Sequence, residues 1–196
     1  MPFLFLETGI PKNIAEDLSK CGKKITYKPR EVIVLQEQYL DKLFYVEKGF
    51  VKFTLFSLEG GEQTVFYLSK GFFCGEYPFL AGGLKSDVAM EAATETQLLV
   101  FTQCTKECLC QIEGFKKLLL LNMSLIAKMI KTQIVNITLH CAEERICKTM
   151  EEAERYFKNE EGNKISLTRK EIADLSGCSV ETVNRYMKAI KDREMK

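Results

Sequence analysis

A heptad repeat runs through the middle of the chain. Its six positions alternate at spacings of four and three residues: Met123, Ala127, Ile130, Ile134, Ile137 and Cys141. This spacing predicts a helix that packs along its length against another helix. A second apolar stripe of the same segment falls on a different helix face and comprises Leu118, Leu121, Leu125 and Met129.

These two stripes predict one long helix over residues 116–141, about 39 Å in length. One face is expected to pack on the core of its own chain, and the heptad face to form an interface with a partner. The alternative is that both faces are buried within a single chain.

Before this helix, from about residue 25 to residue 101, apolar residues tend to recur at every second position, which is a period of two. The segments ITYKPREVIVL, KLFYVEKGFVKFTLFSL, EQTVFYLSKGFF and TQLLVF are rich in β-branched and aromatic residues, which is typical of strands. We expect hairpin turns at Glu47-Lys48-Gly49 and at Glu59-Gly60-Gly61-Glu62. The pattern predicts a β-barrel or sandwich, preceded by a short helix over residues 10–23.

Two short helices are predicted beyond the long one, after a polar loop at residues 159–164. Thr168 and Glu171 have the spacing of a capping box, which starts a helix, and Gly177 suits its end. Ser179 is a good N-cap for the next helix, whose apolar stripe is Val183, Met187 and Ile190. Two helices joined by a glycine turn predict a helix-turn-helix, whose second helix lies in the DNA major groove.

The polar side of that second helix carries groups suited to DNA. Arg185 can bond guanine through two donors, and Glu181 can accept from the cytosine amino group. Ser179, Thr182 and Lys188 complete this face. The alternative is an ordinary helical hairpin with one solvated face.

The segment SLTRKEIADLSGCSVETVNRYMKAIKD resembles the DNA-binding motif of the CRP/FNR family of bacterial transcription regulators. Val180, where the cyclic-AMP receptor branch has Arg, makes the motif more similar to the FNR branch, although Asn184 stands where that branch has Ser. The segment YVEKGFVKFTLFSLEGGEQTVFYLSKGFFCGE resembles the family's cyclic-nucleotide-binding β-roll.

The resemblance implies an α+β fold with three parts. They are an effector-sensing, jelly-roll-like β-roll with an N-terminal helix (residues 1–115), a dimerisation helix (116–141) and a helix-turn-helix domain (142–196). Members of the family continue into a β-hairpin wing, so we expect the wing to be missing or truncated in this sequence.

The resemblance also implies the partners. A symmetric homodimer would bind double-stranded DNA at an inverted repeat, here with half-sites related to TTGAT, and RNA polymerase would be a further partner. Glu181 and Arg185 would read bases. The residues expected at the DNA are Thr168, Arg169, Ser179, Val180, Glu181, Thr182, Asn184, Arg185 and Lys188.

Cyclic AMP is not the expected effector. Members that bind it hold its phosphate with a Gly-Glu pair, matched here by Gly75-Glu76, and with an Arg followed by Ser or Thr. Ser86 and Asp87 occupy those two places, and no Arg occurs between positions 30 and 145. A different small molecule, with an anion favoured by the lysines, is expected near Gly75, Glu76, Tyr77, Lys85, Ser86, Ile130 and Lys131. The alternative is a vestigial, empty pocket.

The eight cysteines are expected to be reduced thiols in a cytoplasmic protein. Cys104, Cys108 and Cys110 match no common zinc or iron–sulfur spacing, and the N-terminal part holds only Cys21, so neither a metal site nor an iron–sulfur cluster is supported. Redox sensing through the cysteines remains an alternative trigger.

Catalysis is not expected, since the chain has one histidine, His140, and no phosphate-binding loop. No apolar run is expected to be long enough to cross a membrane, and MPFLFLETGIP lacks the features of a signal peptide. A sensor module with the same β-roll but without DNA binding is the remaining alternative.

Overall fold

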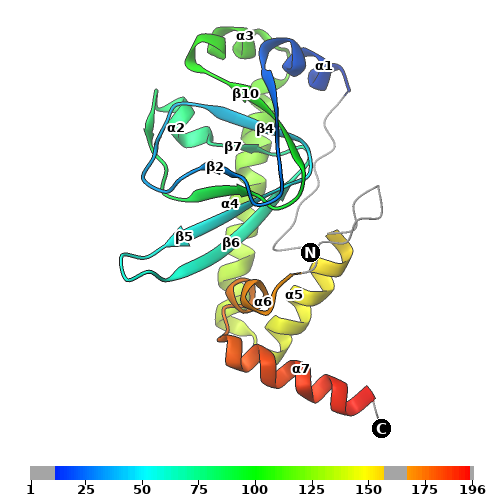
Figure 1. Ribbon diagram of the computed structural model, residues 1–196. Helices are drawn as coiled ribbons and strands as arrows, with labels where there is room; N and C mark the ends of the chain where they lie inside the picture. The colour runs from blue at the N-terminus through cyan, green and yellow to red at the C-terminus, as the bar shows by residue number, and fades with distance from the viewer. Residues whose placement is uncertain (1–11, 157–166, 195–196) are drawn as a thin grey trace.

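The computed structural model describes residues 12–156 and 167–194 (Figure 1). The predicted loop at residues 159–164 lies outside these ranges. The predicted N-terminal helix is α1 (Lys12–Cys21). Two four-stranded antiparallel sheets and the long helix α4 (Phe115–Leu139) then occupy the upper part of Figure 1, and α4 continues down to three further helices.

The predicted β-domain is a roll built from two sheets. The first has the order β1 (Lys23–Tyr27), β10 (Thr96–Phe101), β4 (Leu43–Lys48) and β7 (Phe73–Cys74). The second has the order β2 (Val32–Val34), β9 (Ala89–Ala92), β5 (Phe50–Phe56) and β6 (Glu62–Ser69). A small pair is formed by β3 (Tyr39–Leu40) and β8 (Leu84–Lys85).

Apolar side chains from both sheets fill the inside of the roll. Val46, Val51, Leu98 and Phe72 are fully buried there, and Met129 of α4 closes the same core. This burial explains the period of two in the sequence, since alternate strand residues face the interior.

One of the two predicted hairpin turns is wrong. Glu59-Gly60-Gly61-Glu62 does join the paired strands β5 and β6. Gly49, however, lies between β4 and β5, which belong to different sheets. It has a φ of +86°, and a Cβ there would lie 2.4 Å from the Glu95 carbonyl oxygen. Its turn is therefore a corner where the chain changes sheets.

Helix α4 confirms the predicted long helix, with one correction to its inner face. Leu118 and Met129 are buried, but Leu121 is 51% exposed. Asn122 takes the inner position instead, where its side chain accepts from Phe73 N (3.0 Å) and donates to the Gly71 carbonyl oxygen (3.1 Å). A buried amide at this position satisfies two backbone groups of the roll.

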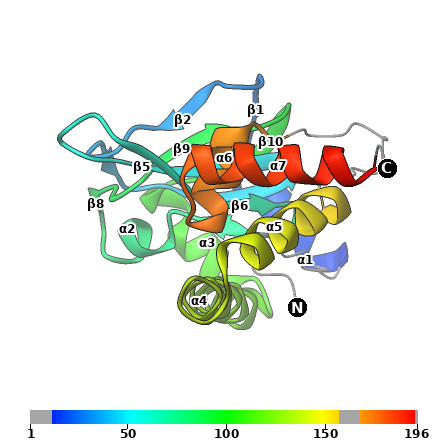
Figure 2. The ribbon, with the colours of Figure 1, turned by 90° about the horizontal axis from the view of Figure 1, so that it is seen from below.

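The heptad face of α4 is uncovered within this chain. Figure 2 shows α4 end-on at the edge of the molecule. Met123, Ile130, Ile134 and Ile137 are 39–58% exposed, and Ala127 is also exposed. Cys141 is exposed too, but it lies beyond the end of α4 at Leu139, so the predicted stripe ends at Ile137. An exposed apolar stripe of this length is typical of an interaction surface.

The expectation about membrane-spanning length is wrong for this helix. Helix α4 is long and apolar enough to cross a membrane by length and composition, with a mean hydropathy of 1.4 over 18 residues. Core helices of soluble proteins pass the same test, but only 22% of this window is buried within the chain. The exposed heptad face carries part of the apolar character of α4.

The expectation that all cysteines are reduced is also wrong. Cys21 at the end of α1 forms a disulfide with Cys108 in α3 (Lys106–Gln111), while the other six cysteines are free. The bond closes a sequence separation of 87 residues. It links α1 and α3, which lie together at the top of Figure 1.

Candidate nucleic-acid interface

The predicted helix-turn-helix consists of α6 (Arg169–Ser176) and α7 (Val180–Glu194). The capping box is confirmed, because Glu171 N donates to Thr168 Oγ1 and Thr168 N donates to the Glu171 carboxylate. Gly177 ends α6 with a φ of +62°, a conformation that glycine adopts at no steric cost. The local sequence signals therefore set both ends of α6.

Close packing between the two helices fixes their angle. Ala173 and Val183 are 1% and 0% exposed and share a core with Ile146 of α5 (Ala142–Tyr156) and Ile172. Met187 is partly buried against the same core, and the side chain of Ile190 lies outside the described part. The predicted apolar stripe thus faces inward and turns the opposite side of α7 outward.

Most of the predicted DNA-contacting side chains lie on that outward side. Val180, Glu181, Arg185 and Lys188 are exposed. The side chains of Glu181, Arg185 and Lys188 make no hydrogen bond or ion pair with any residue in the described part of the chain. Helix α7 forms the lower edge of the molecule, below α6 (Figure 1). We name the exposed side chains of Val180, Glu181, Asn184, Arg185 and Lys188 the reading face.

Other predicted contacts are engaged within the motif. Ser179 Oγ accepts from Thr182 N at 3.1 Å, so it caps α7, and its hydroxyl lies 2.9 Å from Thr182 Oγ1. The Arg169 guanidinium donates to the amide oxygen of Asn184. Thr168 is held in its capping box.

Arg145 of α5 is a positioning residue that the sequence analysis did not single out. Its guanidinium donates to carbonyl oxygens at the end of α4, Ile137 (3.3 Å) and His140 (2.9 Å). It also donates to Ser176 (2.8 Å) and Gly177 (3.1 Å) at the end of α6. The C-termini of two helices carry partial negative charge, which a cation stabilises. Arg145 therefore connects the end of α4 to the turn between α6 and α7.

The seven predicted effector residues are spread over the roll and α4. No hydrogen bond or ion pair joins any two of them, and all lie in the described part. Lys85 pairs with Glu37 at the surface (3.4 Å), and Ser86 donates to the Val88 carbonyl oxygen (2.7 Å). Tyr77, Ile130 and Lys131 are exposed, and a Cβ on Gly75 would lie 2.7 Å from the Lys42 carbonyl oxygen.

Glu76 is the exception, because its carboxylate points inward. Its Oε1 is buried and has no hydrogen-bond partner in the described part of the chain. Burial raises the pKa of Glu76 from 4.5 to about 7. A hollow of about 100 Å³ nearby is lined by other residues, including Tyr27, Gln38, Lys42 and Phe44. Gly75 adjoins Lys42 of this lining, but Glu76 itself is not among the lining residues.

Comparison with known proteins places both halves of the chain. Residues 24–110 match the family described as "Cyclic nucleotide-binding domain". Residues 165–194 match "Bacterial regulatory proteins, crp family". The first range covers the roll, and the second covers α6 and α7.

Individual relatives agree with these matches. The nitrogen fixation regulation protein FixK of Rhizobium meliloti is 30% identical over 170 residues, which cover 87% of this chain and 76% of the relative. The cAMP-activated global transcriptional regulator CRP of Salmonella typhimurium is 25% identical over 175 residues, covering 86% and 82%. The c-di-GMP responsive regulator CLP of Xanthomonas campestris has a similar fold, with a TM-score of 0.79 at 18% identity over 94% of this chain and 93% of that one.

Proposed function

Because this chain belongs to the CRP/FNR family of bacterial transcription regulators, we propose that it binds inverted-repeat DNA as a homodimer under the control of a small molecule in its roll. The observation that carries the proposal is the reading face: Glu181 and Arg185 are one helix turn apart on the exposed side of α7. RNA polymerase is a further proposed partner, and the proposed location is the cytoplasm.

The heptad face of α4 supports the dimer. Two copies of α4 packed through Met123, Ala127, Ile130, Ile134 and Ile137 would remove an exposed apolar stripe from water. Twofold symmetry would then place two copies of α7 about one DNA turn apart, as an inverted repeat requires. The proposed division is residues 1–115 for sensing, 116–141 for dimerisation and 142–196 for DNA binding, and it is supported by the end of α4 at Leu139 and the start of α5 at Ala142.

The proposed effector is a small molecule other than cyclic AMP. Ser86 stands where cyclic-AMP-binding members have Arg, and its hydroxyl donates a hydrogen bond to the Val88 carbonyl oxygen. The anion expected from the sequence now has weaker support, because Lys85 is paired with Glu37 at the surface. Glu76 Oε1, which is buried without a hydrogen-bond partner in the described part of the chain, favours a ligand with hydroxyl, amide or amine donors.

The test of DNA binding is selection from random DNA. We expect the wild-type protein to enrich an inverted repeat with two equal half-sites. The variant Arg185→Ala, which keeps the fold, should enrich a site with relaxed preference at one base of each half. A selection that enriches no inverted repeat would overturn the proposal.

A thermal-shift screen of cyclic nucleotides and of neutral or cationic amides and polyols, repeated on Glu76→Gln, would identify the effector class.

A second trigger is supported by the Cys21–Cys108 disulfide. Disulfides in cytoplasmic proteins are usually transient and catalytic or redox-sensing. If this bond is the trigger, a dithiol reductant changes the DNA affinity of the wild type and leaves the affinity of Cys21→Ser unchanged. Equal affinities with and without reductant would remove this alternative.

A further inference from the structure

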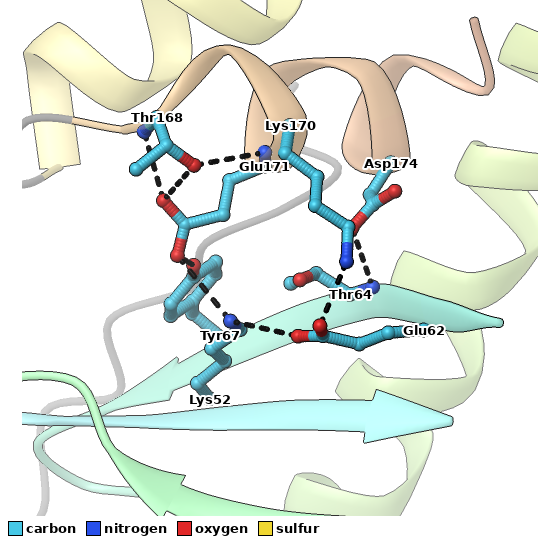
Figure 3. Close-up of polar contacts among 8 residues, drawn as sticks. All are labelled: Lys52, Glu62, Thr64, Tyr67, Thr168, Lys170, Glu171 and Asp174. Carbon is cyan, nitrogen blue, oxygen red and sulfur yellow. Dashed lines mark hydrogen bonds and ion pairs between the residues drawn. The ribbon is translucent and has the colours of Figure 1, made fainter. Parts of the chain in front are cut away.

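Strand β6 of the roll is in direct contact with α6 of the DNA-binding motif. The backbone N of Thr64 donates to the Asp174 carboxylate at 3.0 Å, and the Gln63 side chain donates to the Asp174 carbonyl oxygen at 2.8 Å. Figure 3 shows α6 lying over the strands, with its acidic and basic side chains directed at them. The two halves of the chain are therefore joined by a second route besides α4 and α5.

A network of charged and polar side chains extends this contact. Tyr67 Oη donates to Glu171 Oε1 (2.9 Å), and Lys52 Nζ lies 3.4 Å from the same oxygen. Lys52 also lies 3.7 Å from Glu62, which receives a hydrogen bond from Lys170 (2.7 Å). We name this set the α6–roll contact; it comprises Lys52, Glu62, Thr64, Tyr67, Lys170, Glu171 and Asp174 (Figure 3).

The centre of the α6–roll contact is shielded from water. Tyr67 is 1% exposed, and the side chains of Lys52 and Glu171 are 12% and 20% exposed. Burial alone would raise the pKa of Glu171, but hydrogen bonds from Thr168 and Tyr67 and the charge of Lys52 lower it below its usual value. The contact is thus held by partners that are costly to separate, unlike an exposed ion pair.

The same two strands face the interior of the roll with their opposite side. Lys52 is paired with Tyr67 across the β5–β6 ladder, and the next pair is Phe53 with Phe66. Phe53 and Phe66 stack at 4.6 Å between ring centroids in the roll core. Since successive strand residues alternate between faces, β5 and β6 form a wall one sheet thick between the sensor interior and α6.

The α6–roll contact leaves the reading face uncovered. Glu181, Asn184, Arg185 and Lys188 are exposed while α6 is held on the strands. The docked arrangement therefore presents α7 outward, and releasing it would give α7 a wider range of orientations.

Resting on the function proposed above, we infer that the α6–roll contact positions the reading face for DNA and couples the roll interior to it independently of α4. Lys52, Tyr67, Glu171 and Asp174 are positioning residues in this role. A change in the packing of Phe53 and Phe66 shifts strands β5 and β6, and these strands carry α6 with them.

The experiment compares a double variant, Lys52→Met with Tyr67→Phe, against the wild type. The variant keeps the Lys52 stem and the buried Tyr67 ring but removes both groups of the roll that hold Glu171, and it leaves the hydrogen bonds from Thr168 within the motif intact. Lys24→Met is the matched control, because it removes an ion pair with Glu47 (2.7 Å) on the other sheet. Fluorescence anisotropy measures affinity for the selected inverted repeat and for a single half-site, and amide hydrogen exchange of Thr64 reports docking directly.

We expect faster amide exchange at Thr64 and about tenfold weaker binding to the inverted repeat. Binding is weaker because the two copies of α7 in the proposed dimer are no longer held in place, and orienting both on the DNA costs entropy. Half-site affinity should stay within about twofold, since α6 and α7 themselves are intact. The control should match the wild type in all three measurements. Unchanged or tighter binding to the inverted repeat, or an equal loss on the half-site, would overturn the inference. If the wild type binds no inverted repeat, the proposed function is wrong. The amide exchange of Thr64 would still show whether the variant loses the α6–roll contact.

Discussion

At the scale of single residues, the division of labour on α7 follows from what each side chain already touches. Ser179 and Thr182 are engaged in starting the helix, and Asn184 accepts from Arg169. Glu181, Arg185 and Lys188 are exposed. The sequence pattern predicted this face because helix caps and apolar stripes are local signals.

Arg185 and Lys188 are expected to respond differently to truncation. Arg185→Ala should cost about 1–3 kcal/mol of binding free energy at the selected site and lower the preference at one base of each half-site. Lys188→Ala should weaken all sequences alike and reduce the slope of log affinity against log salt by about one. Titrations of the selected and scrambled sites at several salt concentrations check both. A uniform loss for Arg185→Ala would argue that it contacts only phosphate.

Glu76 is expected to make stability depend on pH. Its folded-state pKa of about 7 lies above the ordinary 4.5, so its contribution is complete below pH 4.5 and is lost as the pH rises through 7. Glu76→Gln should therefore raise the free energy of unfolding at pH 8 by about 2–3 kcal/mol and change it little at pH 4.5. Urea unfolding at both pH values measures this difference. A variant that is no more stable than the wild type at pH 8 would show that the carboxylate finds a partner.

At the scale of helices and strands, the sequence allowed the types of element to be predicted better than their neighbours. The period of two predicted the strands of the roll, and the apolar stripes predicted α4. The turn at Gly49 was misinterpreted because a local turn signal does not reveal which sheet each strand joins. Asn122 was missed because a hydrophobic pattern passes over a polar residue that satisfies buried backbone groups.

Interactions between segments far apart in the sequence were harder to predict than the elements themselves. The Cys21–Cys108 pair is separated by 87 residues, and connectivity cannot be deduced from cysteine spacing alone. The α6–roll contact was not predicted either, since charged residues such as Lys52 and Glu62 are more often part of solvated surfaces.

The disulfide is expected to stabilise the roll in oxidising buffer. Because it closes a long loop, its loss in Cys21→Ser should lower the free energy of unfolding by about 2–4 kcal/mol. The wild type and the variant should become equally stable once the bond is reduced. Guanidinium unfolding with and without a dithiol reductant provides the comparison. A difference that persists in reductant would mean that Cys21 stabilises the fold through packing instead.

At the scale of the whole molecule, two connections lead from the roll to the reading face. One runs through α4 and Arg145, which holds the ends of α4 and α6 together. The other is the α6–roll contact, in which β5 and β6 hold α6 directly. In the proposed homodimer, an effector that alters either connection would change the orientation of two symmetric copies of α7, and effector and DNA binding would then be reciprocally coupled.

The most direct test of this account is the dependence of affinity on half-site spacing. Anisotropy titrations would compare the selected inverted repeat with versions whose half-sites are moved apart by about five base pairs, half a DNA turn, and by about ten, a full turn. If two copies of α7 are held by one rigid dimer, the half-turn insertion should reduce affinity to that of a single half-site. Equal affinity for the selected and half-turn spacings would contradict the account, because it would mean that each motif binds DNA independently of its partner.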